Sequence, residues 1–194
     1  MAKREKDSDQ AYTRLLAAAG RSFRRGGYGG AGIDALAKDA GLTSGAFYAH
    51  FGSKAEAFRL TVRDGFQVLE DTVVSFHDRF GNGWQRRFVD FYLGELLEMG
   101  IAQACTLPSL SFDVARADAA TRVVYETGLS SLLDKMAAHP SDTGSRQTAL
   151  ALLTTLSGGA AMASAVNTPV LRSQILAAAK TAALEIVRQI DAAD

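Results

Sequence analysis

The sequence predicts an all-α protein of about nine helices, and two observations lead to that expectation. Apolar side chains recur at intervals of three and four residues, which is the periodicity of amphipathic helices. Leu and Ala dominate the apolar residues, while Val, Ile and Thr rarely alternate with polar residues as they do in strands. With 47% hydrophobic residues in a chain of 194, one domain, or a small head on a larger body, can bury a core.

The first expected helix carries one apolar stripe and ends at Gly26-Gly27, where two glycines favour a change of backbone direction. A glycine-rich loop over residues 28–32 follows. A short helix over residues 33–40 comes next, and Gly41 has the position of a left-handed C-cap. The stripe of the first helix consists of Tyr12, Leu15, Leu16, Ala19 and Phe23.

A second short helix is expected to begin after Thr43, a natural N-cap residue, and to end near His50. Two short helices joined by a turn that contains glycine form a helix-turn-helix pattern. Ser53 and Glu56 have the spacing of a capping box, so we expect a long helix to start there and to continue past Val73.

The rest of the chain predicts further helices separated by recognisable breaks. Residues 84–99 and 107–117 have helical periodicity, and Asp118 can cap a helix that continues to Met136. A turn is expected over residues 139–144. An uncharged helix then runs to about Val166, and Thr168-Pro169 has the N-cap and N1 pattern of a last helix.

The uncharged stretch over residues 147–171 was tested against the properties of a membrane span. It contains Ser157-Gly158-Gly159, Asn167 and Pro169, whereas a span needs about 20 predominantly apolar residues. We therefore expect a buried helix and no membrane partner. The charged N-terminus has no apolar run behind it, so we also expect no secretory signal. The single cysteine, Cys105, fits the reducing cytoplasm.

The zero net charge of the chain hides an uneven distribution. Residues 1–60 carry 10 basic and 6 acidic side chains, a charge of +4, so the remaining residues carry −4. A basic end on an acidic body suits a protein that touches a polyanion with one end only.

The segment over residues 27–54 contains the most specific motif of the chain. It reads Gly-Tyr-x4-Ile-Asp-x-Leu-Ala-x2-Ala-Gly-Leu-Thr-x-Gly-x-Phe-Tyr-x-His-Phe-x-Ser-Lys. This string resembles the DNA-binding head of the TetR/AcrR family of bacterial transcriptional regulators. The match is carried by Ala37, Ala40-Gly41, Gly45, Phe47-Tyr48, His50-Phe51 and Ser53-Lys54.

The resemblance implies a three-helix helix-turn-helix head over residues 8–55 and a ligand-binding and dimerisation body over residues 56–194. It implies a cytoplasmic homodimeric repressor that binds a palindromic operator in double-stranded DNA and is released by a small-molecule effector. No cofactor, no metal and no catalytic activity are expected.

Residue chemistry supports roles for individual positions of the head. A recognition helix must be slim where it enters the major groove, and Ser44 can also form a hydrogen bond with a base edge. Tyr48 and Lys54 can reach phosphates, and the backbone amide of Gly32 can do the same. For His50 we expect packing or a phosphate contact. The complete expected DNA-binding set is Gly32, Ser44, Gly45, Ala46, Tyr48, Ala49, His50 and Lys54.

Two sets of body residues have expected roles. Small residues in the uncharged helix allow close helix contact, and the resemblance implies that the last two helices form a four-helix bundle with the partner. The expected dimer residues are Leu156, Gly158, Gly159, Ala160, Met162, Ala163 and Ile186. Large apolar and polarisable side chains can line an effector pocket or form a plain core. The pocket candidates are Phe88, Phe91, Tyr92, Met99, Cys105, Phe112 and Tyr125.

Three alternatives remain open at the level of sequence. Cys105, near the start of a helix, can be a reactive thiol in an electrophile- or redox-sensing repressor, or a small buried apolar residue. Arg24-Arg25 can be a phosphate patch or ordinary charges at a helix end. A helical ligand carrier or an enzyme would leave the N-terminal motif unused, and the histidines lack metal-ligand spacing.

Overall fold

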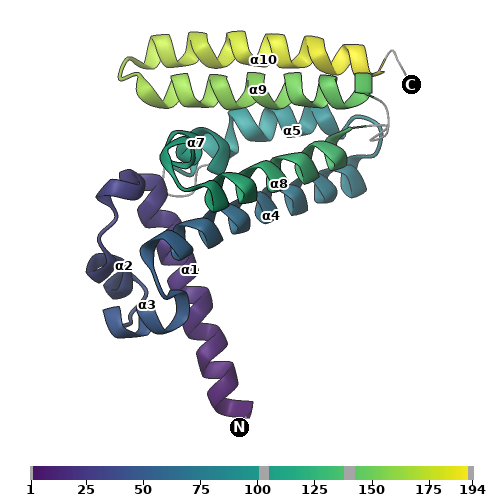
Figure 1. Cartoon of the computed structure of the whole chain (residues 1–194). Helices are drawn as coiled ribbons and strands as arrows, with labels where there is room; N and C mark the ends of the chain where they lie inside the picture. Colours follow the sequence, from purple (N-terminus) through teal and green to yellow (C-terminus); the bar gives the residue numbers. More distant parts are fainter. Residues whose placement is uncertain (1, 101–104, 138–142, 192–194) are drawn as a thin grey trace.

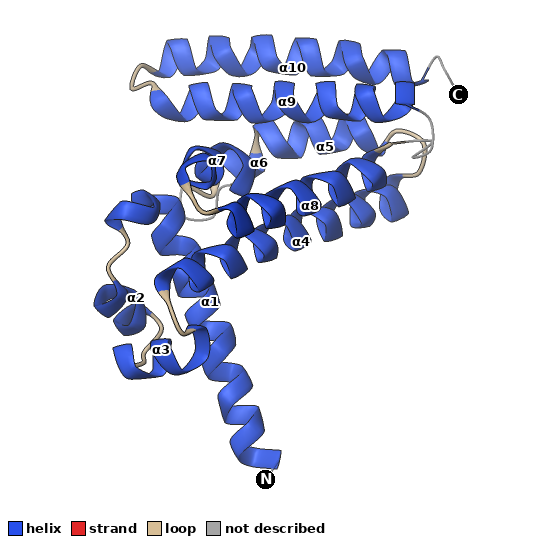
Figure 2. Cartoon of the chain, in the orientation of Figure 1, coloured by secondary structure: helices blue, strands red, loops and turns tan. Residues whose placement is uncertain are grey.

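The structure is a computed structural model that describes residues 2–100, 105–137 and 143–191. Within these ranges the regular elements are all helices, which confirms the predicted all-α class (Figure 2). The helices are α1 (Ala2–Gly30), α2 (Ile33–Asp39), α3 (Ser44–Phe51), α4 (Lys54–Phe80), α5 (Trp84–Leu93), α6 (Glu95–Glu98), α7 (Thr106–Arg116), α8 (Ala119–Met136), α9 (Thr143–Ala165) and α10 (Pro169–Asp191).

The helices α1, α2 and α3 form a small head, and the start of α4 packs against it (Figure 1). The turn between α2 and α3 follows the predicted C-cap. Gly41 has a φ of 69°, its N–H donates to the Lys38 carbonyl over 3.0 Å, and the Leu42 N–H donates to the Ala37 carbonyl over 2.9 Å. This pair of bonds is a Schellman motif, and it sets the angle between the two helices.

Side-chain caps begin α3 and α4 at the predicted residues. The Ala46 N–H donates to the Thr43 hydroxyl over 3.2 Å, and the Glu56 N–H donates to the Ser53 hydroxyl over 3.1 Å. The Glu56 carboxylate forms an ion pair with Arg59 on the next turn of α4. Each helix therefore starts at a residue that satisfies one of its free amides.

The first helix is interrupted where predicted, at Gly26-Gly27. Gly27 has non-helical backbone angles, with φ 67° and ψ 179°, and a further helical turn that reaches Gly30 takes the place of the start of the expected loop. The kink turns Tyr28 back onto the Phe23 and Phe58 rings, with centroids 6.1 Å and 5.2 Å away. Aromatic packing therefore retains a helical turn that the glycine content alone argues against.

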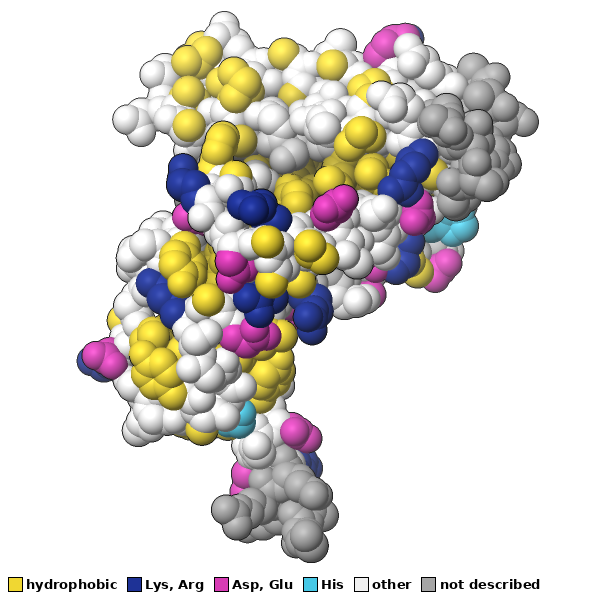
Figure 3. Space-filling view, in the orientation of Figure 1, with side chains coloured by type: hydrophobic (Ala, Val, Ile, Leu, Met, Phe, Trp, Pro, Cys, Tyr) yellow, Lys and Arg dark blue, Asp and Glu magenta, His cyan; other side chains and the backbone are white. Residues whose placement is uncertain are grey.

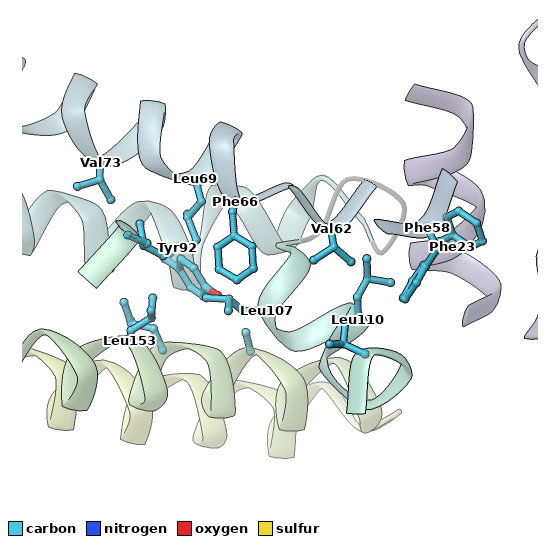
Figure 4. Close-up of a cluster of buried hydrophobic side chains, with 14 of the residues drawn as sticks. Phe23, Phe58, Val62, Phe66, Leu69, Val73, Tyr92, Leu107, Leu110 and Leu153 are labelled. Atoms are coloured by element: carbon cyan, nitrogen blue, oxygen red, sulfur yellow. The ribbon is translucent and has the colours of Figure 1, made fainter. Parts of the chain in front are cut away.

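The body consists of two helical layers. The long helix α4 packs along α8, the antiparallel pair α9 and α10 crosses the other side, and α5 lies between them (Figure 1). Phe66, Leu69 and Val73 of α4 point toward Tyr92 of α5 and Leu153 of α9 in the core between the layers (Figure 4). The helix α7 closes the end of the body next to the head.

Two details of the body were not predicted. The helix expected over residues 84–99 is broken at Gly94, whose φ of −116° and ψ of −98° are not helical, so that α5 and the single turn α6 replace it. Residues 139–142 of the predicted turn lie outside the described residues, and α9 begins at Thr143.

The stretch Ser145–Ala165 of α9 is the only part of the described chain that is long and apolar enough to cross a membrane, with a mean hydropathy of 1.3. Only 33% of its most apolar window is buried inside the chain. In the structure it packs against α5, α7, α8 and α10 as a helix of the body. One face of α9 nevertheless remains uncovered.

Candidate DNA interface and body cavity

The short helix α3 has a buried aromatic face and an exposed face of small residues. Phe47 and Phe51 are buried, with ring centroids 5.1 Å apart, and anchor the helix to the head. On the other side, Gly45 and Ala49 are exposed, while Ser44 and Ala46 are half-buried. A helix anchored in this way presents a slim outer surface that fits a major groove.

Tyr48 and His50 leave α3 in different directions. Tyr48 is 51% exposed and touches the Phe47 ring edge-on at 5.5 Å, so its hydroxyl is available to a phosphate beside the helix. The half-buried His50 ring lies against Tyr12 of α1, with centroids 6.2 Å apart. This contact agrees with packing as one role of His50.

Lys54 is the first residue of α4, and its ammonium lies 4.8 Å from the centre of the Tyr28 ring. The ring thus holds the cation beside the first turn of α4, where the backbone amides and the helix dipole also attract an anion. Gly32 is exposed at the N-cap position of α2 and has no side chain to cap that helix. Both features suit the binding of phosphates.

Two carboxylates of α2 make contacts that sequence reasoning missed. The Ser44 hydroxyl donates to the Asp34 carboxylate over 2.5 Å, across the turn from α3 to α2. Asp39 accepts from the Arg21 guanidinium of α1 over 2.7 Å. The sequence shows Asp34 only as an acidic residue in the first turn of a short helix, and its link to Ser44 depends on the angle between α2 and α3.

A cavity of about 230 Å³ opens into the body where α1, α4, α5, α6 and α7 meet. Its wall is mostly apolar, and a few polar groups come from α1, α4 and α7. Three of the predicted pocket residues, Phe91, Met99 and Cys105, lie in this wall. The complete lining is Arg24, Asp64, Gly65, Val68, Leu69, Thr72, Phe91, Leu96, Met99, Cys105 and Thr106.

The other pocket candidates lie elsewhere. Phe88 and Tyr92 are buried in the core between the layers, and the Tyr125 hydroxyl lies 2.8 Å from the Ser111 hydroxyl. Phe112 is 76% exposed, so it does not line the cavity. The reason is helical geometry, because α7 turns Leu107, Leu110 and Val114 inward and Phe112 falls on the opposite side.

Arg24 faces the body cavity and not the outer surface of the head. Burial lowers the pKa of its guanidinium, and the charge of Asp64 partly opposes that shift. Burial raises the pKa of the Asp64 carboxyl, and Arg24 opposes that shift in turn. A cation from the head and an anion from α4 therefore meet at the cavity, and of the two arginines only Arg25 remains exposed on the head.

The surroundings of Cys105 favour the protonated thiol. The side chain is half-buried in the cavity wall, and desolvation raises the pKa of its thiol. The Tyr92 hydroxyl, the Leu107 backbone N–H and the charge of Arg24 oppose the rise. The start of α7 thus lowers the pKa of the thiol, as predicted, but burial raises this pKa by more. Tyr92 is buried, and its hydroxyl makes no hydrogen bond of normal geometry among the described residues, although Cys105 and Ser157 lie close enough to affect its pKa.

Several predicted dimer residues are buried inside their own chain. Leu156, Ala160 and Ala163 belong to the core, and Gly159 lies so close to α10 that an added Cβ would stand 2.4 Å from the Ala179 Cβ. Ile186 is half-buried, whereas Met162 is 62% exposed and Gly158 is exposed. Close packing of α9 on α10 within one chain explains the small residues that we had expected between chains.

The outer faces of α9 and α10 are nevertheless uncovered and uncharged over much of their length (Figure 3). The exposed stripes follow the spacing of one helix face. They consist of Thr154, Gly158, Met162 and Ala165 on α9, and of Leu171, Gln174, Ala178 and Ala182 on α10.

No group of three or more His, Cys, Asp or Glu side chains that could hold a metal ion occurs in the part of the chain that the structure describes.

Comparison with known sequences places the head in a family. Residues 15–60 match the family described as "Bacterial regulatory proteins, tetR family". The matched segment runs from the middle of α1 through α2 and α3 to the first turns of α4. A search of curated proteins finds no match.

Comparison with solved structures extends the likeness to the whole fold. A TetR-family transcriptional regulator from Agrobacterium tumefaciens is 15% identical, with a TM-score of 0.72 over 94% of this chain and 96% of that chain. A putative TetR-family regulator from Mesorhizobium loti is 17% identical, with a TM-score of 0.68 over 93% and 96%. Escherichia coli NemR in its reduced form is 18% identical, with a TM-score of 0.69 over 88% and 95%.

The raised pKa of Cys105 leads to a prediction about its reactivity. Near neutral pH, native Cys105 will react more slowly with iodoacetamide than the same cysteine in the denatured chain, because burial disfavours the thiolate. The rate for the native protein will begin to rise only at a higher pH than the rate for the denatured chain. Mass spectrometry of timed samples measures both rates. Faster reaction of the native thiol would contradict a raised pKa of Cys105.

Proposed function

We propose that this TetR-family chain represses transcription as a homodimer on a palindromic operator and leaves the operator when a small molecule occupies the body cavity. The observation that carries the proposal is the head: α3 exposes a slim face of small residues, and exposed Tyr48 and the Lys54 ammonium, which can each bind a phosphate, belong to the same head. Such a protein acts in the cytoplasm, where bacterial DNA lies.

On the operator, α3 enters the major groove. Ser44, Gly45, Ala46 and Ala49 face the base edges, where their small size allows close approach. Tyr48 and Lys54 contact phosphates on one side, and the Gly32 amide contacts a phosphate at the start of α2. His50, held against Tyr12, sets the tilt of α3 on α1.

The dimer forms through the uncovered faces of α9 and α10. These faces are uncharged and meet their copies as a four-helix bundle, in which small residues allow close packing. Gly158 and Met162 belong to this interface, and half-buried Ile186 lies at its margin. Leu156, Gly159, Ala160 and Ala163 support it from inside each chain. The bundle holds the two copies of α3 about 34–36 Å apart, one turn of DNA.

The effector binds in the cavity of about 230 Å³. This volume is below the range of roughly 300–1,000 Å³ typical of drug-sized ligand pockets, so the ligand is compact. It is largely apolar, in keeping with Leu69, Phe91 and Leu96, and carries one polar group toward Arg24, Asp64 or Thr106.

Release follows from the position of Arg24. The cavity wall joins Arg24 of α1, a head helix, to Asp64 of α4, so a ligand there touches both helices at once. Binding changes operator affinity only if the ligand binds the two arrangements of head and body differently. A molecule that separates Arg24 from Asp64 satisfies this condition, because it binds one arrangement of head and body more tightly than the other.

Two other functions receive less support. A thiol-sensing repressor needs a reactive thiolate, whereas burial raises the pKa of Cys105. A helical carrier or an enzyme would make no use of the complete helix-turn-helix head. The proposal therefore rests on ligand binding without covalent chemistry.

Operator binding is tested through its dependence on salt. The logarithm of the wild-type binding constant should fall with the logarithm of salt concentration at a slope of about −0.9 per phosphate neutralised. Lys54→Ala should make the slope shallower by about two such units, one for each protomer of the dimer. Tyr48→Phe and Lys54→Ala should each weaken binding by about fivefold to tenfold on every sequence. Fluorescence anisotropy with promoter fragments measures these changes.

Arg79→Ala serves as the control, because this cation lies at the far end of α4. It should leave the salt slope unchanged. Wild-type protein that ignores its own promoter region at low salt would refute the repressor proposal.

The dimer interface is tested by placing a charge on the outer face of α10. Ala178→Arg should convert the dimer to monomer and lower operator affinity, because an unpaired charge would be desolvated in the bundle. Sedimentation equilibrium gives the oligomeric state. Val74→Arg, on the exposed side of α4, should leave the dimer intact. A dimer that survives Ala178→Arg would place the interface elsewhere.

The cavity is tested by filling it. A panel of small phenols, aromatic acids and aliphatic alcohols is screened for compounds that raise the melting temperature and release the operator. For every such compound, Leu96→Trp should abolish both effects while operator binding persists, because Leu96 lines the cavity. Phe112→Trp, on the exposed side of α7, should retain both effects. Equal release from wild type and Leu96→Trp would exclude this cavity as the effector site.

A further inference from the structure

The hydrogen bond between Asp34 and Ser44 bears on the base sequence that the head selects. This inference rests on the proposed DNA-binding function and goes beyond it. Ser44 is the first residue of α3, and Asp34 lies in the first turn of α2, so the bond bridges the helix-turn-helix at the end of α3 that leads into the groove.

The exposed Asp34 side chain fixes the hydroxyl proton of Ser44. An ionised carboxylate has only acceptor oxygens, so the hydroxyl must donate its single proton to Asp34 over 2.5 Å. Ser44 then keeps two lone pairs and has no proton to offer to a base. A serine without such a partner can donate or accept according to the base that it meets.

The backbone holds both partners in place. Leu36 and Ala37 are buried on the inner face of α2 and fix this helix on the head. Thr43 caps α3 immediately before Ser44. Asp34 and Ser44 are therefore held on two helices whose relative position is already set by packing and by the Gly41 turn.

We propose that Asp34 is a specificity-determining residue, and that the Asp34–Ser44 pair selects a cytosine at the base pair that Ser44 faces. In the major groove, guanine and thymine present acceptors at the matching edge, which the acceptor oxygens of Ser44 and Asp34 repel. Adenine and cytosine each present an amino group, but the adenine amine lies beside the N7 acceptor. The cytosine amine has an acceptor on one side only, O6 of the paired guanine, whereas the adenine amine lies between N7 and O4 of the paired thymine.

The test is selection of binding sites from randomised duplex DNA by the full-length protein. Wild type should enrich a palindrome with a C·G pair at the position of each half-site that Ser44 faces. Asp34→Asn should lower the preference for cytosine at that position by about tenfold, because an amide can donate to Ser44 and free the hydroxyl proton. Ser44→Ala should relax the same position, and the double variant should resemble Ser44→Ala.

Asp39→Asn is the matched control. It removes the same charge from the same helix, so it shares any general gain in affinity for the DNA polyanion. Its base preferences should equal those of wild type. Thermal melting checks that all variants fold.

The outcomes separate this inference from the proposed function. If wild type enriches no sequence and does not bind DNA, the proposed function fails. If wild type enriches a palindrome but Asp34→Asn keeps the same preferences as Asp39→Asn, the role of Asp34 is refuted. An A·T pair at the position that Ser44→Ala relaxes would also refute it, because that pair contains no cytosine.

Discussion

The packing of Phe58 against Phe23 and Tyr28 is the contact on which the two-part design of this protein depends. The three rings meet with centroids 5.1 to 6.1 Å apart. Phe58 belongs to α4 and lies beside Phe23 of α1 (Figure 4), and Tyr28 also belongs to α1. Because α4 continues without a break into the body, a rotation of α1 relative to α4 also changes the position of the head relative to the body. Phe23 and Tyr28 are stacked, and each meets Phe58 edge-on, so the joint between α1 and α4 gains the favourable geometry of aromatic pairs in addition to apolar burial.

The body cavity lies beside that joint. Arg24 occupies the turn of α1 that follows Phe23, and Asp64 occupies the second turn of α4 after Phe58. Each side chain is partly desolvated, and each partly offsets the unfavourable burial of the other. A pair of this kind is sensitive to what fills the space around it, because neither charge is stable in an apolar environment alone. The proposed release of the operator relies on this sensitivity.

Much of the fold follows from local sequence. The caps at Thr43, Ser53 and Asp118 form at the predicted residues, since each satisfies an amide only two or three positions away. The Gly41 turn follows for the same reason. Where the prediction was incomplete, a distant contact adds to the local signal: the helical turn after the Gly27 break carries Tyr28, which packs on Phe58. Phe112 was expected in the pocket, but the inner face of α7 is formed by Leu107, Leu110 and Val114.

The sequence by itself determined the helical class, the order of the helices and the family of the head, because periodicity, caps and a contiguous motif are properties of neighbouring residues. Only the tertiary structure decided which groups meet across helices. It joined Asp34 to Ser44, turned Arg24 toward Asp64 and away from the DNA side, and enclosed Leu156 and Ala160 within one chain. The physical reason is that a helical sequence specifies an apolar face, whereas the partner of that face depends on the packing angles of helices that are far apart in the chain.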